Sequence, residues 1–107
     1  MDAHYTTHLD HTERRIIDAI IKAALAEAMT ISVYDGEEWA VRKSTDYKQI
    51  TAEIAATDET TLRLRSSDGK KIGDILLIHG NGDEVISDHS DNLVTSRLAN
   101  IGQAAAA

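Results

Sequence analysis

Apolar positions early in the chain recur at the spacing of a helix. Asp10 and Glu13 have the spacing of a capping box, in which the N-cap side chain and a glutamate three residues later bond to each other's backbone. The apolar residues that follow lie three and four positions apart: Ile16, Ile17, Ile20, Ile21, Ala24, Leu25 and Ala28. We therefore expect an amphipathic helix from Asp10 to about Ala28. Its wide apolar face is expected to lie flat across a sheet or to contact, in part, a second chain.

The next segment alternates apolar and polar residues, as strands do. Residues 31–34 and 39–42 show this alternation, and Asp35-Gly36 between them is a turn sequence. The order predicts a β-hairpin. Trp39 is expected in the core, although an aromatic beside an acidic turn is also typical of a protein-binding hot spot.

A short second helix is expected after the hairpin. Ser44, Thr45 and Asp46 are candidate helix caps. They precede Tyr47 and two isoleucines that fall on one helical face, and the pattern ends near Thr57.

Three further strands are predicted at residues 61–65, 71–79 and 84–87, separated by turns rich in Gly, Asp and Asn. The first of them alternates, which indicates one buried face and one wet face. The continuous apolar run Ile75 to Ile78 predicts a central strand that is covered on both sides.

A third helix is expected near the end of the chain. Leu93, Val94, Arg97, Leu98 and Ile101 follow helical spacing, and the next residue, a glycine, is placed to end the helix. The resulting order is α-β-β-α-β-β-β-α. It predicts an α+β fold with a mainly antiparallel five-stranded sheet and packed helices. Residues 1–107 are expected to form a single domain with flexible ends at 1–9 and 104–107.

Composition narrows the class of protein. With 42% apolar and 27% charged residues among 107, the chain is typical of a soluble globular domain. It contains no cysteine, which excludes a disulfide framework and a thiolate metal site. No basic start followed by an apolar run is present, so we expect a cytoplasmic protein without a membrane contact.

The net charge of −7 disfavours direct binding to nucleic acid and instead favours a partner protein with a basic surface. The acidic hairpin turn and the acidic residues around the last strand are the candidate partner-binding groups. They are Asp35, Glu37, Glu38, Asp83, Glu84 and Asp88.

Histidines provide the alternative chemistry. His79, Asp88 and His89 are a candidate site for a metal-assisted hydrolase or nuclease, with Asp83 and Asp91 nearby, but their spacing matches no known metal or catalytic signature. His4, His8 and His11 would bring imidazoles together if the tail were helical, although a mobile tail is the preferred interpretation. We therefore predict no catalytic residue, no metal and no cofactor.

Basic residues are few but are placed on neighbouring strands. Arg42, Lys43, Arg63 and Arg65 are expected on exposed strand positions, where they would form a local basic patch that binds phosphate or an acidic partner. Exposed strand positions are often charged to prevent edge pairing, and that interpretation is preferred.

Three stretches together resemble small accessory proteins that bacteriophages and prophages of proteobacteria encode. The stretches are Tyr34-Asp35-Gly36-Glu37-Glu38-Trp39-Ala40-Val41, Ser44-Thr45-Asp46-Tyr47, and Gly73-Asp74-Ile75-Leu76-Leu77-Ile78-His79-Gly80-Asn81 with Val85-Ile86-Ser87-Asp88 after it. The resemblance covers roughly residues 30–92 and lies in turns and strands. It implies a protein of the host cytoplasm that binds host or phage machinery, in a class that includes inhibitors of bacterial immunity such as anti-CRISPR proteins. It carries over no catalytic residue.

The expected function is therefore that of an acidic protein-binding domain, a phage-encoded inhibitor that docks on a basic surface of a nucleic-acid-handling defence complex. The alternatives are the metal-assisted enzyme and a self-associating module that dimerises through the first helix.

Overall fold

The computed structural model describes residues 9–106. It confirms the predicted α+β fold and the order of its elements. Five antiparallel strands form one sheet in the order β2-β1-β3-β4-β5. The strands are β1 (Thr30–Tyr34), β2 (Trp39–Ser44), β3 (Glu59–Arg65), β4 (Lys71–Ile78) and β5 (Ile86–His89).

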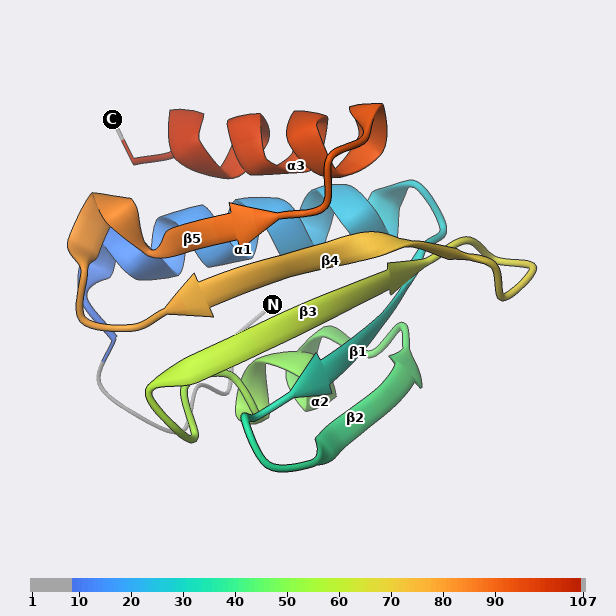
Figure 1. Ribbon diagram of the computed structural model, residues 1–107, viewed down its shortest axis with the longest axis horizontal. Coiled ribbons are helices and arrows are strands. Elements are labelled where there is room, and N and C mark those ends of the chain that lie inside the picture. The colour runs from blue at the N-terminus through green and yellow to red at the C-terminus, as the bar shows by residue number, and fades with distance from the viewer. Residues whose placement is uncertain (1–8, 107) are drawn as a thin grey trace.

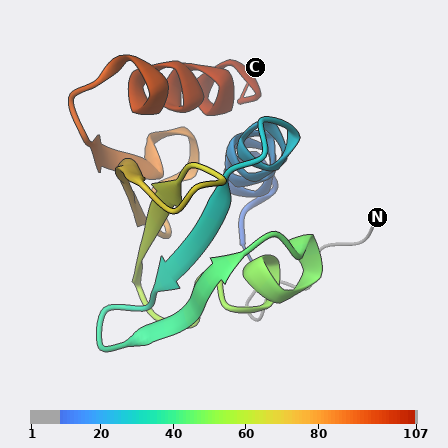
Figure 2. The same cartoon turned by 90° about the vertical axis from the view of Figure 1, so that its right-hand side faces the viewer.

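Three helices pack on one face of this sheet, as Figures 1 and 2 show. They are α1 (His11–Ala26), α2 (Tyr47–Ala52) and α3 (Leu93–Ala104), and a short 3-10 helix, η1 (Gly82–Glu84), joins β4 to β5. The apolar face of α1 is buried against the sheet and α3, with no exposed surface on Ile16, Ile17, Ile20, Ile21 or Ala24. Most of the α1 face that could serve for dimerisation is therefore covered by the chain itself.

The opposite face of the sheet is not covered by any element among residues 9–106. Ile75 and Leu77 of β4 are buried beneath the helices, whereas Leu76 and Ile78 are partly exposed on the open face. The prediction that β4 is covered on both sides is therefore wrong. An apolar run does not reveal that all helices pack on one side.

Trp39 is also on the open face, so its predicted core position is wrong. Its ring packs against Tyr34 with centroids 5.1 Å apart, and the two residues pair across β1 and β2. The Arg63 guanidinium lies 4.7 Å from the Trp39 ring centroid. Trp39 is thus half-buried by its neighbours on the sheet surface.

Element boundaries differ from the predictions where tertiary packing decides them. Gly102 does not end α3, which continues to Ala104. It lies where α3 crosses α1, and a Cβ there would be 2.7 Å from Cγ1 of Ile20. The second helix ends at Ala52 rather than near Thr57, and the last strand begins at Ile86 rather than Glu84.

Asp10 caps α1, accepting a hydrogen bond from Thr12 N at 2.7 Å, but Glu13 does not complete the capping box. Its buried carboxylate instead accepts from the backbone N–H of Gly80 at 3.1 Å and 3.3 Å.

Candidate functional site

Acidic side chains from three loops gather at one end of the sheet. The register decides this: Tyr34 at the end of β1 pairs with Thr61, and Glu59 at the start of β3 pairs with Ile78 at the end of β4. The loops after β1, before β3 and after β4 therefore lie at the same end. We call this set the acidic end; it comprises Asp35, Glu37, Glu38, Asp58, Glu59, Asp83 and Glu84.

The β1–β2 turn is rigidly built. The Asp35 carboxylate accepts hydrogen bonds from the backbone N–H groups of Glu37 (2.9 Å) and Glu38 (2.8 Å), and Gly36 adopts a φ of 102° that favours glycine. The bonds from Glu38 and Glu37 lower the pKa of the Asp35 carboxyl. The Glu37 and Glu38 side chains are exposed, so the turn presents two carboxylates to solvent from a fixed backbone.

Thr57 joins this turn to the loop before β3. Its hydroxyl contacts the carbonyl oxygen of Asp35 and lies 2.8 Å from that of Glu59. A shallow hollow between the two loops is lined by Asp35, Glu37, Asp58 and Glu59, among others. Sequence reasoning missed Asp58 and Glu59, because only the β1–β3 pairing brings them beside the turn.

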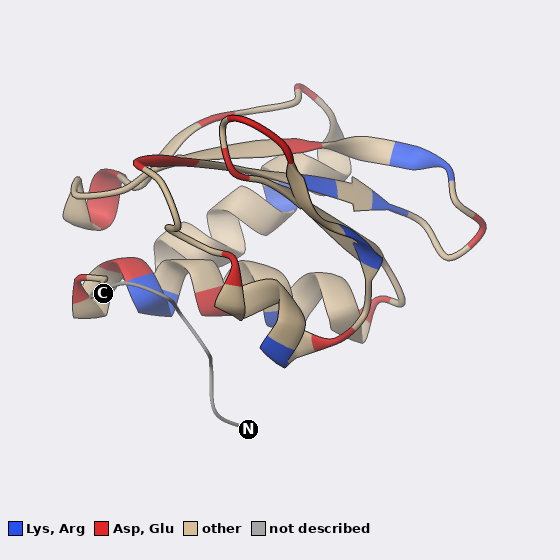
Figure 3. Cartoon of the chain, turned by 90° about the horizontal axis from the view of Figure 1, so that it is seen from below, with Lys and Arg blue, Asp and Glu red and all other residues tan. Residues whose placement is uncertain are grey.

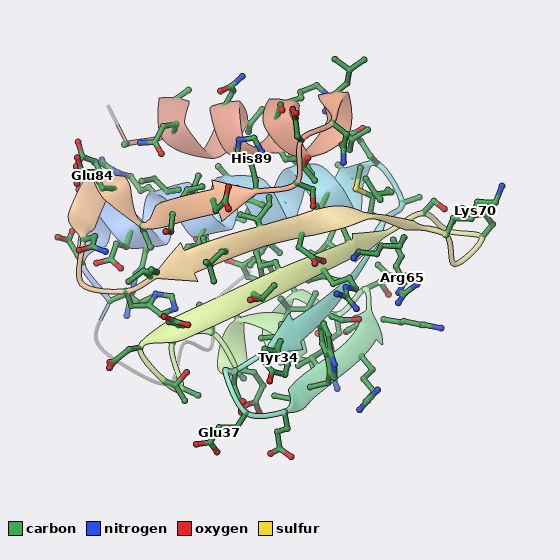
Figure 4. The ribbon with its side chains drawn as sticks, viewed as in Figure 1. Tyr34, Glu37, Arg65, Lys70, Glu84 and His89 are labelled. Carbon is green, nitrogen blue, oxygen red and sulfur yellow. The ribbon has the colours of Figure 1, made fainter. Side chains whose placement is uncertain are left out.

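The remaining predicted partner-binding residues divide into two places. Asp83 and Glu84 lie in η1 at the same end of the sheet, and Gln103 of α3 donates to the Asp83 carbonyl at 2.6 Å. Strand β3 lies between the two strands that the β1–β2 turn joins and the two strands that η1 joins, so the two sets lie at opposite edges of this end. Figure 4 shows Glu37 and Glu84 at two corners of this end. Asp88 is part of β5, where it pairs with Leu76, and does not join the acidic end.

The structure does not bring the candidate catalytic histidines together. His79 is buried beside Glu13, with Nδ1 3.7 Å from the glutamate oxygen and Nε2 2.7 Å from the Thr60 hydroxyl. Burial lowers the pKa of His79, and the charges of Glu13 and Asp58 oppose that effect. His89 pairs with Ile75, four positions along β4 from His79, and its Nδ1 faces the Ser90 carbonyl at 2.9 Å.

No group of three His, Asp or Glu side chains within residues 9–106 could hold a metal ion. His4 and His8 lie outside the described residues, and His11 is the first residue of α1.

The basic residues do come together on the open face. Arg42, Lys43, Arg63 and Arg65 line one cavity with Ser32 and Trp39. The cavity extends along the sheet from Trp39, beside the acidic end, to Arg65 near the other end. Figure 3 shows the Lys and Arg residues of the sheet gathered in the half opposite the acidic loops. The sheet is thus acidic at one end and carries a basic cavity toward the other.

Comparison of the chain with protein-family models, curated proteins and solved structures finds no match. The resemblance to phage accessory proteins therefore stays a prediction. In the part of the chain that the structure describes, no helix is long and apolar enough to cross a membrane.

Proposed function

We propose that the chain is a protein-binding domain that docks through its acidic end onto a basic surface of a partner. The observation that carries the proposal is the convergence of three acidic loops at one end of a sheet whose other charged cluster is basic. A chain of net charge −7 whose carboxylates are concentrated in this way attracts and orients a basic partner during encounter.

The structure of the loops supports binding by a preformed surface. Asp35 fixes the β1–β2 turn through two backbone hydrogen bonds, and Thr57 links it to the neighbouring loop. The exposed Glu37 and Glu38 therefore lose little backbone freedom when they bind. If the predicted phage origin holds, the partner is a nucleic-acid-handling defence complex, whose basic groove would accept such an acidic surface.

The test begins with recovery of partners of the tagged full chain from its native host at low salt. The affinity of the recovered protein is then measured against salt for the wild type and for Glu37→Lys. Reversing this charge should weaken binding about tenfold and flatten its salt dependence.

Asp91→Lys is the matched control, because it makes the same charge change at an exposed position before α3, where β5 leads away from the acidic end. It should weaken binding far less. Equal losses in the two variants, or unchanged affinity of Glu37→Lys at low salt, would contradict docking through the acidic end. Glu84→Lys then shows whether η1 belongs to the same contact.

A further inference from the structure

A cavity of about 350 Å³ opens on the uncovered face of the sheet. Four of its six lining residues are basic. The lining consists of Ser32, Trp39, Arg42, Lys43, Arg63 and Arg65, which we call the basic cavity. In Figure 4, Arg65 lies at the side of the sheet opposite Glu84.

The cavity exists because a small residue lies between long ones. Ser32 of β1 is 5% exposed and pairs with Arg63 of β3 on one side. On its other side it faces β2. Its short side chain leaves space that the longer side chains on both neighbouring strands surround.

A β-bulge places two cations opposite Ser32. Ile31 pairs with Ser44 and Val33 pairs with Val41, so Ser32 alone opposes both Arg42 and Lys43. Lys43 adopts a φ of 49°, in the left-handed region, and its backbone N–H donates to the Ser32 hydroxyl at 2.9 Å. In a regular ladder these consecutive side chains would point to opposite faces, whereas here both line the cavity.

The two arginines on β3 complete the cavity, and of the two only Arg63 is paired with a carboxylate in the described chain. Arg63 makes a two-pronged contact with Asp74 at 2.9 Å and 3.1 Å, and this contact fixes it over Trp39. Arg65 donates to the Gly69 carbonyl at 3.1 Å, but its buried Nε has no hydrogen-bond partner among residues 9–106. Arg42, Lys43 and Arg65 form no ion pair with any residue of the described chain.

We propose that the basic cavity binds the phosphate group of a small phosphorylated molecule of about nucleotide size. Guanidinium groups match phosphate oxygens in geometry and charge, and the cavity is within the range that holds small ligands. Trp39 supplies an aromatic wall for the rest of the molecule. A single phosphate group is attracted mainly by the cations of the cavity. A polyanion such as nucleic acid is repelled by the net charge of −7.

Trp39 makes the proposal directly measurable, because it is the sole tryptophan of the chain. Its fluorescence, together with amide chemical shifts, is followed while the full chain is titrated with inorganic phosphate, a nucleoside monophosphate or a short single-stranded oligonucleotide. We expect saturable binding of the monophosphate, with shifts at Ser32 and Lys43, and weaker binding of inorganic phosphate and of the oligonucleotide. Absence of saturation with the monophosphate would overturn the proposal. Tighter binding of the oligonucleotide would also overturn it, in favour of a nucleic-acid surface.

Matched variants separate the local site from the overall charge. Arg42→Gln should weaken monophosphate binding about tenfold, because it removes one uncompensated cation of the cavity. Lys48→Gln removes the same charge from the exposed surface of α2 and should change the affinity by less than about twofold. Equal losses in both variants would assign the effect to overall charge and overturn the proposal.

Lys43→Gly distinguishes binding from folding. Glycine suits the φ of 49°, so the variant should melt no lower than the wild type while it binds the monophosphate less tightly. Unchanged binding of the monophosphate in both Lys43→Gly and Arg42→Gln would show that the bulged residues are not part of the binding site. Glu37→Lys, which tests the acidic end, should leave this binding intact, so the two proposals succeed or fail separately.

Discussion

At the scale of single residues, Ala28 shows how a helix end can be built with a residue that does not suit it. Met29 N bonds to the Ala24 carbonyl and Ala28 N to that of Leu25, both at 3.1 Å, which is the Schellman pattern that ends α1. Ala28 has a φ of 63°, a left-handed conformation that costs an L-residue about 1–2 kcal/mol. The motif normally places glycine there.

Ala28→Gly should therefore stabilise the domain by about 1 kcal/mol, because it relieves this strain at an exposed position. Thermal or urea unfolding measures the change. Ala26→Gly, at the last residue of α1, is the control and should destabilise by up to about 1 kcal/mol, since helical φ values disfavour glycine. A loss of stability in both variants would contradict the strain at Ala28.

His79 leads to a prediction about pH. Burial lowers the pKa of His79 in the folded chain. At mildly acidic pH, His79 therefore binds a proton more readily in the unfolded chain than in the folded chain. The unfolded state then binds more protons below its pKa of about 6.5, and the free energy of unfolding should fall as the pH is lowered from about 7 to about 5.5.

Urea unfolding at several pH values measures this slope, and His79→Gln should flatten it across the same interval. His89→Gln is the control, because the His89 ring lies at the Ser90 carbonyl and not beside Glu13. Carboxylates whose pKa is lowered, such as Asp35 and Asp74, lose their contribution only in more acidic solution, near and below their ordinary range, so the two effects separate. An identical slope in wild type and His79→Gln would contradict the assignment.

At the scale of elements, periodicity predicted the three α-helices and the five strands, but neither the short η1 helix nor how the elements are packed. Alternation along β3 and the Asp35-Gly36 turn are local features, so they were visible in the sequence. The bulge at Ser32 was not, because one residue opposing two is a property of a pair of strands. The one-sided covering of the sheet places Trp39 and Leu76 on the open face, and it is set by where the helices pack.

The close contact between α1 and α3 leads to a prediction about the stability of the domain. A Cβ on Gly102 would lie 2.7 Å from Cγ1 and 2.9 Å from Cδ1 of Ile20, and 3.1 Å from the Ile16 carbonyl oxygen. Gly102→Ala should therefore destabilise by about 1–3 kcal/mol, although alanine is the better helix former.

A double-mutant cycle with Ile20→Ala checks this explanation. Removing the two Ile20 carbons opens space for the new methyl group, so the double variant should be less destabilised than the sum of the single variants. Strict additivity, or a stabilising Gly102→Ala, would show that the helices do not approach this closely.

At the scale of the whole molecule, part of the candidate site could be predicted and part could not. Asp35, Glu37 and Glu38 share one turn, so the sequence alone placed them together. The contribution of Asp58 and Glu59, and the exclusion of Asp88, depend on strand register. The four basic residues were expected on neighbouring strands, but their convergence on a cavity required the Ser32 bulge.

Gathering carboxylates at one end has a cost for the free protein, and this leads to the last prediction. Like charges in three adjoining loops repel one another, and salt screens that repulsion. Glu37→Gln combined with Glu59→Gln should raise the melting temperature at low salt by about 2 °C and reduce the stabilisation that added salt gives. The same variant should bind the partner less tightly. If the acidic end functions in binding, this variant should gain stability and lose affinity for the partner. Unchanged affinity would show that these carboxylates contribute only to solubility.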